Sequence, residues 1–95
     1  MKSTIKDSRT VQVMEVLGDD SRYAMYKLLL KGEDLCVGEI AARIGISISA
    51  VSQHFRSFES AGLIDKVRKG QKICYRLRSD DQFVKKLIRF TKGTI

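Results

Sequence analysis

Apolar residues recur every three or four positions along most of the chain, which predicts a mainly helical protein. Val11, Met14 and Leu17 keep this spacing, and a second apolar series runs over 23–30 after two aspartates that can cap a helix. We therefore expect two helices between residues 8 and 31.

Two further helices are predicted in the middle of the chain, separated by a very short turn. The apolar positions of 37–44 are followed by Gly45, a typical helix stop. Those of 48–61 are preceded by Ser47 as a cap and followed by Gly62 as a stop. A three-residue connection is the spacing of a helix-turn-helix unit, in which the second helix crosses the first at a steep angle.

An alternating pattern follows the fourth predicted helix. Ile73, Tyr75 and Leu77 alternate as in a half-buried strand, and Lys69-Gly70 is typical of a tight turn. We therefore predict a two-stranded β-hairpin.

A final helix is predicted after the hairpin. Ser79 with Gln82 three residues later fits a capping box, and Asp80 and Asp81 add negative charge at the positive end of the helix dipole. The apolar face of this helix is wider than one small domain usually buries and contains Phe83, Val84, Leu87, Ile88 and Phe90. The predicted fold is mainly α with a small β-hairpin (α+β), in the order ααααββα.

The positive charge of the chain is concentrated in its last third. Residues 1–65 contain 8 Lys and Arg against 9 Asp and Glu, whereas 66–95 contain 10 against 2, and the net charge is +7. A segment this basic is typical of proteins that bind a polyanion, and nucleic acid is a better candidate than an anionic membrane surface. The alternative is that the basic residues only form a solvated surface.

The fourth predicted helix has a small, polar face near its start. In a helix-turn-helix unit this helix enters the major groove of DNA, where short residues allow close approach and Gln53 can make a bidentate contact with adenine. The alternative is that Ser and Gln merely solvate a surface helix. The predicted DNA-binding residues are Ser47, Ser49, Ala50, Ser52, Gln53, His54 and Arg56.

The predicted hairpin is basic enough to follow DNA phosphates as a wing. Its charge is expected to contribute affinity and salt dependence, whereas the helix contributes the choice of sequence. The predicted wing contacts are Arg68, Lys69, Gln71 and Lys72.

The segment 17–77 contains the landmarks LGDDSRYAMYKLLL, LCVGEIAARIGIS, SAVSQHF, AGLI and KGQKICYRL. Together they resemble the ArsR/SmtB family of winged helix-turn-helix repressors. The resemblance implies a homodimer, built largely from the first and last helices, that binds an inverted-repeat operator and usually represses. The residues expected at the dimer interface are Val11, Met14, Phe83, Leu87 and Phe90.

The sequence departs from the metal-sensing members of that family. Many of them have Cys-Val-Cys at the start of the third helix, whereas this chain has Cys36-Val37-Gly38, and its last helix contains no histidine. One cysteine without a nearby histidine cannot supply a three- or four-ligand site. We therefore expect no metal and no other cofactor.

Cys36 and Cys74 are too few for a disulfide scaffold, and a reducing compartment would keep them as free thiols. Cys36 lies at the predicted start of a helix, a position that activates thiols. A redox response through Cys36 is therefore one hypothesis, and a buried, inert cysteine is the other. Cys74 is expected on the strand face opposite Ile73, Tyr75 and Leu77, and the sequence leaves open whether the two thiols meet.

These observations predict a single domain over 1–95 that regulates transcription by binding double-stranded DNA. No apolar run approaches the length of a membrane span, and MKSTIKDSRT lacks a secretory signal, so we expect a cytoplasmic protein without membrane contact.

His54, the only histidine, is interpreted as a DNA contact or else as a partly buried structural residue. No nucleophile-base pair or carboxylate cleft is evident, so we expect neither an enzyme nor a small-molecule substrate. The alternative function is a winged-helix module that binds RNA or a protein partner.

Overall fold

The computed structural model describes residues 8–94, which form five helices and three strands. The predicted order of four helices, two strands and a final helix is confirmed, with one short strand added before the third helix. Residues 1–7 and 95 of the predicted domain lie outside the described residues. The elements are α1 (Ser8–Leu17), α2 (Asp20–Leu29), β1 (Leu35–Cys36), α3 (Val37–Ile44), α4 (Ile48–Ser60), β2 (Ile64–Lys69), β3 (Lys72–Leu77) and α5 (Gln82–Thr94).

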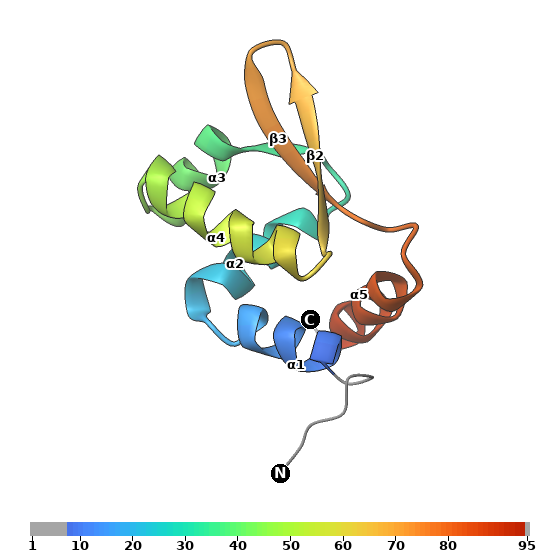
Figure 1. The fold of residues 1–95 in the computed structure, drawn as a ribbon. Helices are drawn as coiled ribbons and strands as arrows, with labels where there is room; N and C mark the ends of the chain where they lie inside the picture. Colours follow the sequence, from blue (N-terminus) through green and yellow to red (C-terminus); the bar gives the residue numbers. More distant parts are fainter. Residues whose placement is uncertain (1–7, 95) are drawn as a thin grey trace.

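The sheet is antiparallel and has β3 at its centre, in the order β1-β3-β2. The long pairing joins β2 to β3, from Ile64 opposite Leu77 to Lys69 opposite Lys72. Gly70 begins the connecting turn with a φ of 63°, a left-handed conformation that glycine adopts without steric cost. The hairpin projects from the helical body, and α1 and α5 lie at the opposite end of the molecule from its tip (Figure 1).

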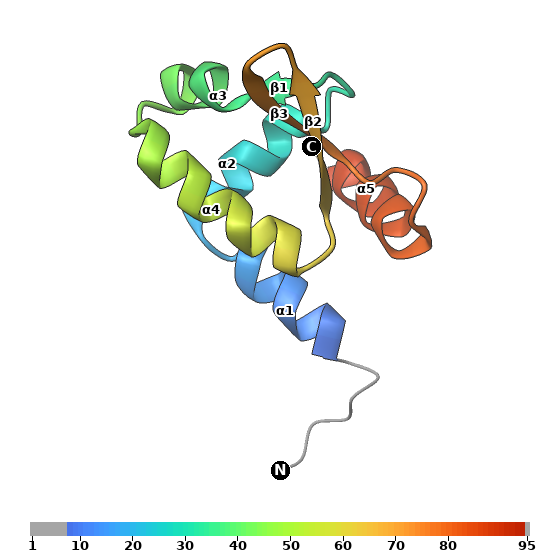
Figure 2. The same ribbon diagram turned by 45° about the horizontal axis from the view of Figure 1, so that its top comes forward.

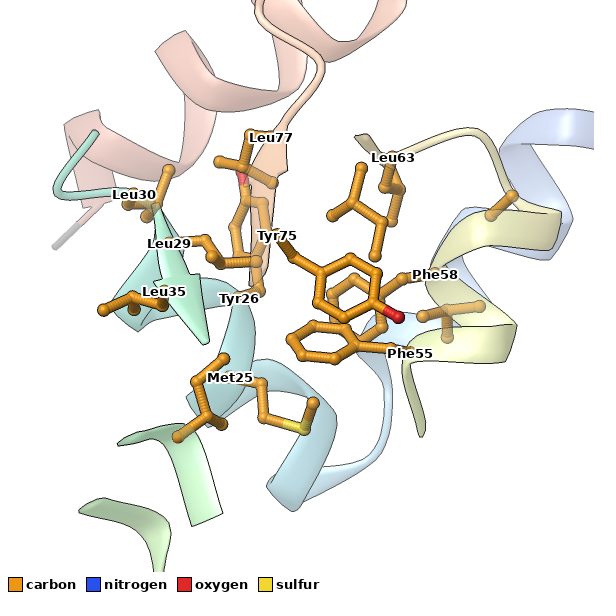
Figure 3. Packing of buried hydrophobic residues seen from close by; sticks show 14 of the residues in the cluster. Met25, Tyr26, Leu29, Leu30, Leu35, Phe55, Phe58, Leu63, Tyr75 and Leu77 are labelled. Carbon is orange, nitrogen blue, oxygen red and sulfur yellow. The ribbon is translucent and has the colours of Figure 1, made fainter. Parts of the chain in front are cut away.

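The core lies between α2, α4 and the sheet. Phe55 packs against Phe58 at a ring separation of 5.4 Å and against Tyr75 of β3 at 4.2 Å (Figure 3). Val51, Phe55 and Phe58 form one apolar stripe of α4 at helical spacing, and all three side chains are fully buried. Burial of each such side chain contributes about 1.5–3 kcal/mol, so the inner face of α4 is held firmly and its outer face is fixed in orientation.

The predicted turn between α3 and α4 is confirmed in detail. Gly45 has a φ of 82° and donates its N–H to the carbonyl oxygen of Ala41 at 2.9 Å, which ends α3. The Ser47 hydroxyl accepts the N–H of Ala50 at 3.0 Å and begins α4. Figure 2 shows the two helices crossing directly after this short connection.

The predicted capping box of Ser79 and Gln82 is wrong. Residues after β3 form a turn in which the N–H of Asp81 donates to the carbonyl of Arg78 at 3.0 Å, so α5 begins only at Gln82. The cap is Asp81, whose carboxylate accepts the N–H of Val84 at 3.1 Å.

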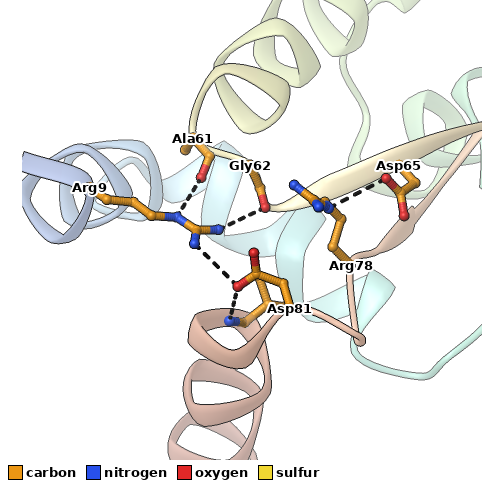
Figure 4. Close-up of polar contacts among 7 residues, drawn as sticks. Arg9, Ala61, Gly62, Asp65, Arg78 and Asp81 are labelled. Atoms are coloured by element: carbon orange, nitrogen blue, oxygen red, sulfur yellow. Dashed lines mark hydrogen bonds and ion pairs between the residues drawn. The ribbon is translucent and has the colours of Figure 1, made fainter.

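Arg9 of α1 joins three parts of the fold (Figure 4). Its guanidinium donates to the carbonyl oxygens of Ala61 at 3.3 Å and Gly62 at 3.0 Å, and to the Asp81 carboxylate at 3.2 Å. It also lies 4.7 Å from the centre of the Phe83 ring. These contacts hold α1, the end of α4 and the start of α5 together.

None of the helices within residues 8–94 combines the length and apolarity needed to cross a membrane.

Candidate nucleic-acid interface

The outer face of α4 has the polar character expected of a recognition helix. Ser49, Gln53 and Arg56 are exposed, and Ala50 and Ser52 flank them as half-buried residues. Ser47 is exposed as well, and its hydroxyl oxygen already caps the helix. The exposed side chains lie opposite the buried Phe55 stripe, so a duplex could approach them without disturbing the core.

His54 faces a different neighbour. Its Nδ1 lies 3.5 Å from Nη1 of Arg22, and the side chain is half-buried. The Arg22 guanidinium also donates to the carbonyl oxygens of Val16 at 2.7 Å and Glu15 at 3.3 Å, two of the free acceptors at the end of α1. The structure thus gives His54 an intramolecular partner, and its contact with DNA stays a prediction.

Asp19, immediately before α2, also stabilises the connection between α1 and α2. Its carboxylate accepts the N–H of Arg22 at 3.0 Å and caps the helix. That backbone hydrogen bond, followed by the positive charge of Arg22, lowers the pKa of Asp19 below its usual value. The junction between α1 and α2 is therefore fixed directly behind α4.

The four predicted wing residues are all exposed, but they differ in their partners. Lys69 forms an ion pair with Asp34 at 3.3 Å. Arg68 and Lys72 form no ion pair with any residue of the segment 8–94, and Gln71 lies in the turn between the strands. Arg68 and Lys72 are therefore the wing cations with the most freedom to bind phosphates.

Asp34 is the acidic centre at the base of the wing. Besides Lys69, it binds Arg76 of β3 at 3.1 Å. Burial acts to raise the pKa of Asp34, but the hydrogen bond from Lys69 and the charge of Arg76 prevail and lower it. The charge count along the sequence could not reveal this pairing, because Asp34 precedes the basic segment by more than thirty residues.

A groove of about 740 Å³ separates α4 from the hairpin. One stripe of α4, containing Ile48, Ser52 and Arg56, forms one side, and Lys66 and Lys72 lie on the other. Ile48 is not among the predicted DNA-binding residues, and it is 60% exposed although it is large and apolar. Its position outside the stripe of Val51, Phe55 and Phe58 was the signal that could have identified it.

Cys36 and Cys74 are joined by a disulfide, so the prediction of free thiols is wrong. The physical reason is β1, which places Cys36 directly opposite Cys74 in an antiparallel pair with β3. Cys36 is also the cap residue immediately before α3, and its N–H donates to the Glu39 carboxylate at 3.0 Å. The bond thus ties the helix-turn-helix unit to the wing. Within residues 8–94 no three His, Cys, Asp or Glu side chains form a group that could hold a metal ion.

The five residues expected at a dimer interface are not equally exposed. Val11, Met14 and Phe90 are 49%, 64% and 69% exposed, respectively. Phe83 and Leu87 are half-buried and pack against the core. An apolar surface on α1 and α5 therefore remains open in the single chain, with Met14 and Phe90 as its most exposed members.

Comparison with known proteins matches the central part of this structure to one family. The model for bacterial regulatory proteins of the arsR family matches residues 19–66, from the cap of α2 into β2. The transcriptional repressor SdpR of Bacillus subtilis is 36% identical over 70% of this chain and 73% of its own length. The chain spans about half the length of the arsenical and cadmium resistance regulators that it also matches.

Solved structures agree over nearly the whole chain. HlyU from Vibrio cholerae, named a transcriptional activator, superposes with a TM-score of 0.83 at 25% identity and covers 97% of both chains. The homodimeric winged helix-turn-helix domain of Mb0332 from Mycobacterium bovis has a TM-score of 0.79 at 22% identity, over 98% of this chain and 86% of its own. Because the family model covers half of the sequence and SdpR matches over most of its length, this chain belongs to the arsR family of bacterial regulatory proteins.

Proposed function

We propose that the protein regulates transcription as a homodimer that binds an inverted-repeat operator in double-stranded DNA. The observation that carries this proposal is the position of the polar outer face of α4 beside a basic hairpin. Gln53 and Arg56 are exposed on the helix, and Arg68 and Lys72 are exposed on the hairpin without an ion-pair partner in residues 8–94. A helix of this kind fits the major groove, which is about 12 Å wide.

The outer face of α4 and the basic hairpin would contribute differently to DNA binding. Gln53 carries an amide that can donate to and accept from the edge of adenine at the same time, which discriminates between bases. Arg68 and Lys72 would neutralise phosphates, which adds affinity for any sequence and makes binding depend steeply on salt. The helix therefore determines the operator, and the hairpin determines most of the salt dependence.

The homodimer is supported by the open apolar surface of Val11, Met14 and Phe90 and by the homodimeric Mb0332 domain of the same fold. Two-fold pairing would present two α4 helices about 34 Å apart, which matches successive major grooves and an inverted repeat. Of the activities named for the relatives, we favour repression, because occupying a promoter needs no surface beyond the one that binds DNA.

The proposal is tested by selecting bound duplexes from a random pool and measuring affinities for the selected operator. Gln53→Ala should relax the preference at one base pair by about tenfold, because a bidentate contact discriminates by about 1–3 kcal/mol. Arg68→Ala should weaken all duplexes alike and reduce the salt slope by about one. Lys85→Ala, an exposed charge on α5, is the matched control and should do neither.

Failure of selection, or unchanged binding in both variants, would contradict the proposal. Structured RNA measured at the same salt concentration separates the alternative function, since the deep, narrow major groove of A-form RNA excludes a helix. Tighter binding to RNA than to the selected duplex would favour the RNA-binding alternative.

A second candidate function is a thiol-based response, and the disulfide between Cys36 and Cys74 favours it. Disulfides are uncommon in reducing compartments and, where present, are usually transient or redox-sensing. A dithiol reductant would donate two electrons and two protons, yielding two protein thiols and its own disulfide. The disulfide between β1 and β3 would then be broken, and the wing would no longer be covalently joined to the segment that leads into α3.

The second candidate is tested by titrating the selected operator with oxidised and with reduced protein. We expect the two forms to differ in affinity, and we expect Cys74→Ser to behave alike under both conditions. Equal affinity of the oxidised and reduced wild-type protein would exclude this response while leaving DNA binding intact.

A further inference from the structure

Ile48 is the one large apolar side chain of α4 that the fold leaves open. It is 60% exposed, whereas Val51, Phe55 and Phe58 of the same helix are fully buried. Exposed single apolar residues are common on proteins. This one, however, is the single apolar residue among the exposed residues of α4, and the others are all polar or charged: Ser49, Gln53, Arg56, Glu59 and Ser60.

The position of Ile48 directs its side chain outward. It is the first residue of α4, immediately after the cap formed by Ser47. Because Cα–Cβ bonds tilt toward the start of a helix, this side chain projects toward the N-terminal end of α4, the end that meets base edges in a helix-turn-helix unit. It borders the groove that also contains Arg56 and Lys72.

The charges around the groove favour an anionic occupant. Three cations line it, Arg56 from α4 and Lys66 and Lys72 from the hairpin, against two carboxylates, Glu39 and Glu59, so the lining is positive overall. Lys66 is only loosely paired, with its Nζ 3.8 Å from the Glu59 carboxylate. Cations that flank an exposed apolar side chain fit a partner with a phosphate backbone and an apolar group in its groove. In the major groove of unmodified DNA that group is the C5-methyl of thymine.

We propose that Ile48 is a specificity-determining residue that contacts the C5-methyl group of a thymine in the operator. The inference rests on the proposed DNA binding, and it adds a base contact by a residue that is not among the predicted DNA-binding residues. Isoleucine has no hydrogen-bonding group, so it cannot select a base by donor and acceptor pattern. It favours thymine because removing the methyl group leaves its own apolar surface facing water.

The experiment replaces each thymine of the selected operator, one at a time, by deoxyuridine. This substitution removes only the methyl group and leaves base pairing and the O4 acceptor unchanged. At one position in each half-site, the wild-type protein should bind the uracil duplex about fourfold more weakly, the effect of one buried methyl-sized group. Ile48→Ser should bind the thymine and uracil duplexes equally, because its hydroxyl gains nothing from the methyl group.

Ser60→Ala is the matched control, since Ser60 is exposed at the far end of α4 and the variant should retain the preference for thymine over uracil. Ile48 is not part of the core, so the thermal midpoint of Ile48→Ser should match that of the wild type. Equal binding of all uracil duplexes by the wild type would overturn the inference, as would an undiminished uracil effect in Ile48→Ser. In both cases selective binding of the duplex would persist, whereas failure of the proposed function would abolish it.

Discussion

The phenolic oxygen of Tyr26 lies 2.7 Å from the hydroxyl oxygen of Thr91, and this buried hydrogen bond joins α2 to α5. The Thr91 hydroxyl also lies 2.9 Å from the carbonyl oxygen of Leu87 in its own helix. Thr91 can therefore donate to Leu87 while it accepts from Tyr26. The contact fixes α5, which carries the exposed Phe90, against the same core that supports α4.

Tyr26→Phe should lower the free energy of unfolding by about 1 kcal/mol, the usual net value of one hydrogen bond. The loss is modest because the buried ring is retained and Thr91 keeps its bond to Leu87. Burial raises the pKa of Tyr26, so the phenol stays protonated at neutral pH. Urea denaturation measures the change. Tyr23→Phe, which removes the hydroxyl of a half-buried tyrosine, is the control, and an equal loss in both variants would contradict the role assigned to Tyr26.

The interactions of Asp81 predict that the folded protein loses stability in acid. The N–H of Val84, followed by the guanidinium of Arg9, lowers the pKa of Asp81 in the folded protein. A carboxyl whose pKa is lower in the folded state stabilises the protein above its unfolded pKa. That stability is lost as the pH falls through the folded value. Urea midpoints measured at neutral pH and near pH 3 should therefore differ less in Asp81→Asn than in the wild type.

Asparagine is also a good helix cap, so Asp81→Asn removes the charge and largely preserves the capping. Asp81→Ala removes both and should cost about 1 kcal/mol at neutral pH. The same acid sensitivity in Asp81→Asn as in the wild type would show that the charge of Asp81 contributes nothing to stability.

The helices and the helix-turn-helix turn could be predicted because each has a strong local signal. Gly45 and Ser47 determine the turn through their own backbone and side-chain preferences, whatever surrounds them. β1 could not be predicted, since two residues carry no periodicity and the strand exists only by pairing with β3. The disulfide between Cys36 and Cys74 depends on that pairing and was missed with it.

The same distinction applies to the candidate site. The exposed face containing Gln53 follows from helical spacing alone. The pairing of Lys69 with Asp34 and of His54 with Arg22 depends on contacts between distant segments, which charge and composition do not encode. Ile48 was missed for a different reason, because apolar residues are assigned to the core by default.

Gly62 should tolerate a side chain less well than Gly45. Both have positive φ, of 71° and 82°, so alanine at each costs about 1–2 kcal/mol in backbone strain. A Cβ at Gly45 meets no atom within 4 Å, whereas one at Gly62 lies 3.1 Å from Nη2 of Arg9. Gly62→Ala should therefore destabilise the protein more, because the Arg9 guanidinium must shift by a few tenths of an ångström against its three acceptors.

A double-mutant cycle isolates the contribution of Arg9. In an Arg9→Ala background, the cost of Gly62→Ala in urea denaturation should fall to that of Gly45→Ala. A cost independent of Arg9 would mean that backbone strain alone limits the position.

Phe90 and Met14 predict how strongly the chain associates with itself. Both are large, apolar and mostly exposed in the single chain, and burial of such a side chain contributes about 1.5–3 kcal/mol. In a two-fold dimer each position occurs twice, so Phe90→Ser should cost about 3 kcal/mol or more and raise the dimer Kd by about a hundredfold or more. Sedimentation equilibrium measures this Kd. Arg89→Ser, an exposed neighbour on α5, should leave it nearly unchanged.

DNA binding then separates the dimer surface from the recognition surface. Because Phe90 lies on α5 and the proposed base contacts lie on α4, Phe90→Ser should bind a single half-site as the wild type does. It should bind the full inverted repeat more weakly, since the two half-sites gain affinity together only when the protomers are joined. A wild-type Kd for the dimer in Phe90→Ser would place the dimer interface elsewhere on the molecule. Reduced binding to the single half-site would instead mean that α5 supports α4 directly.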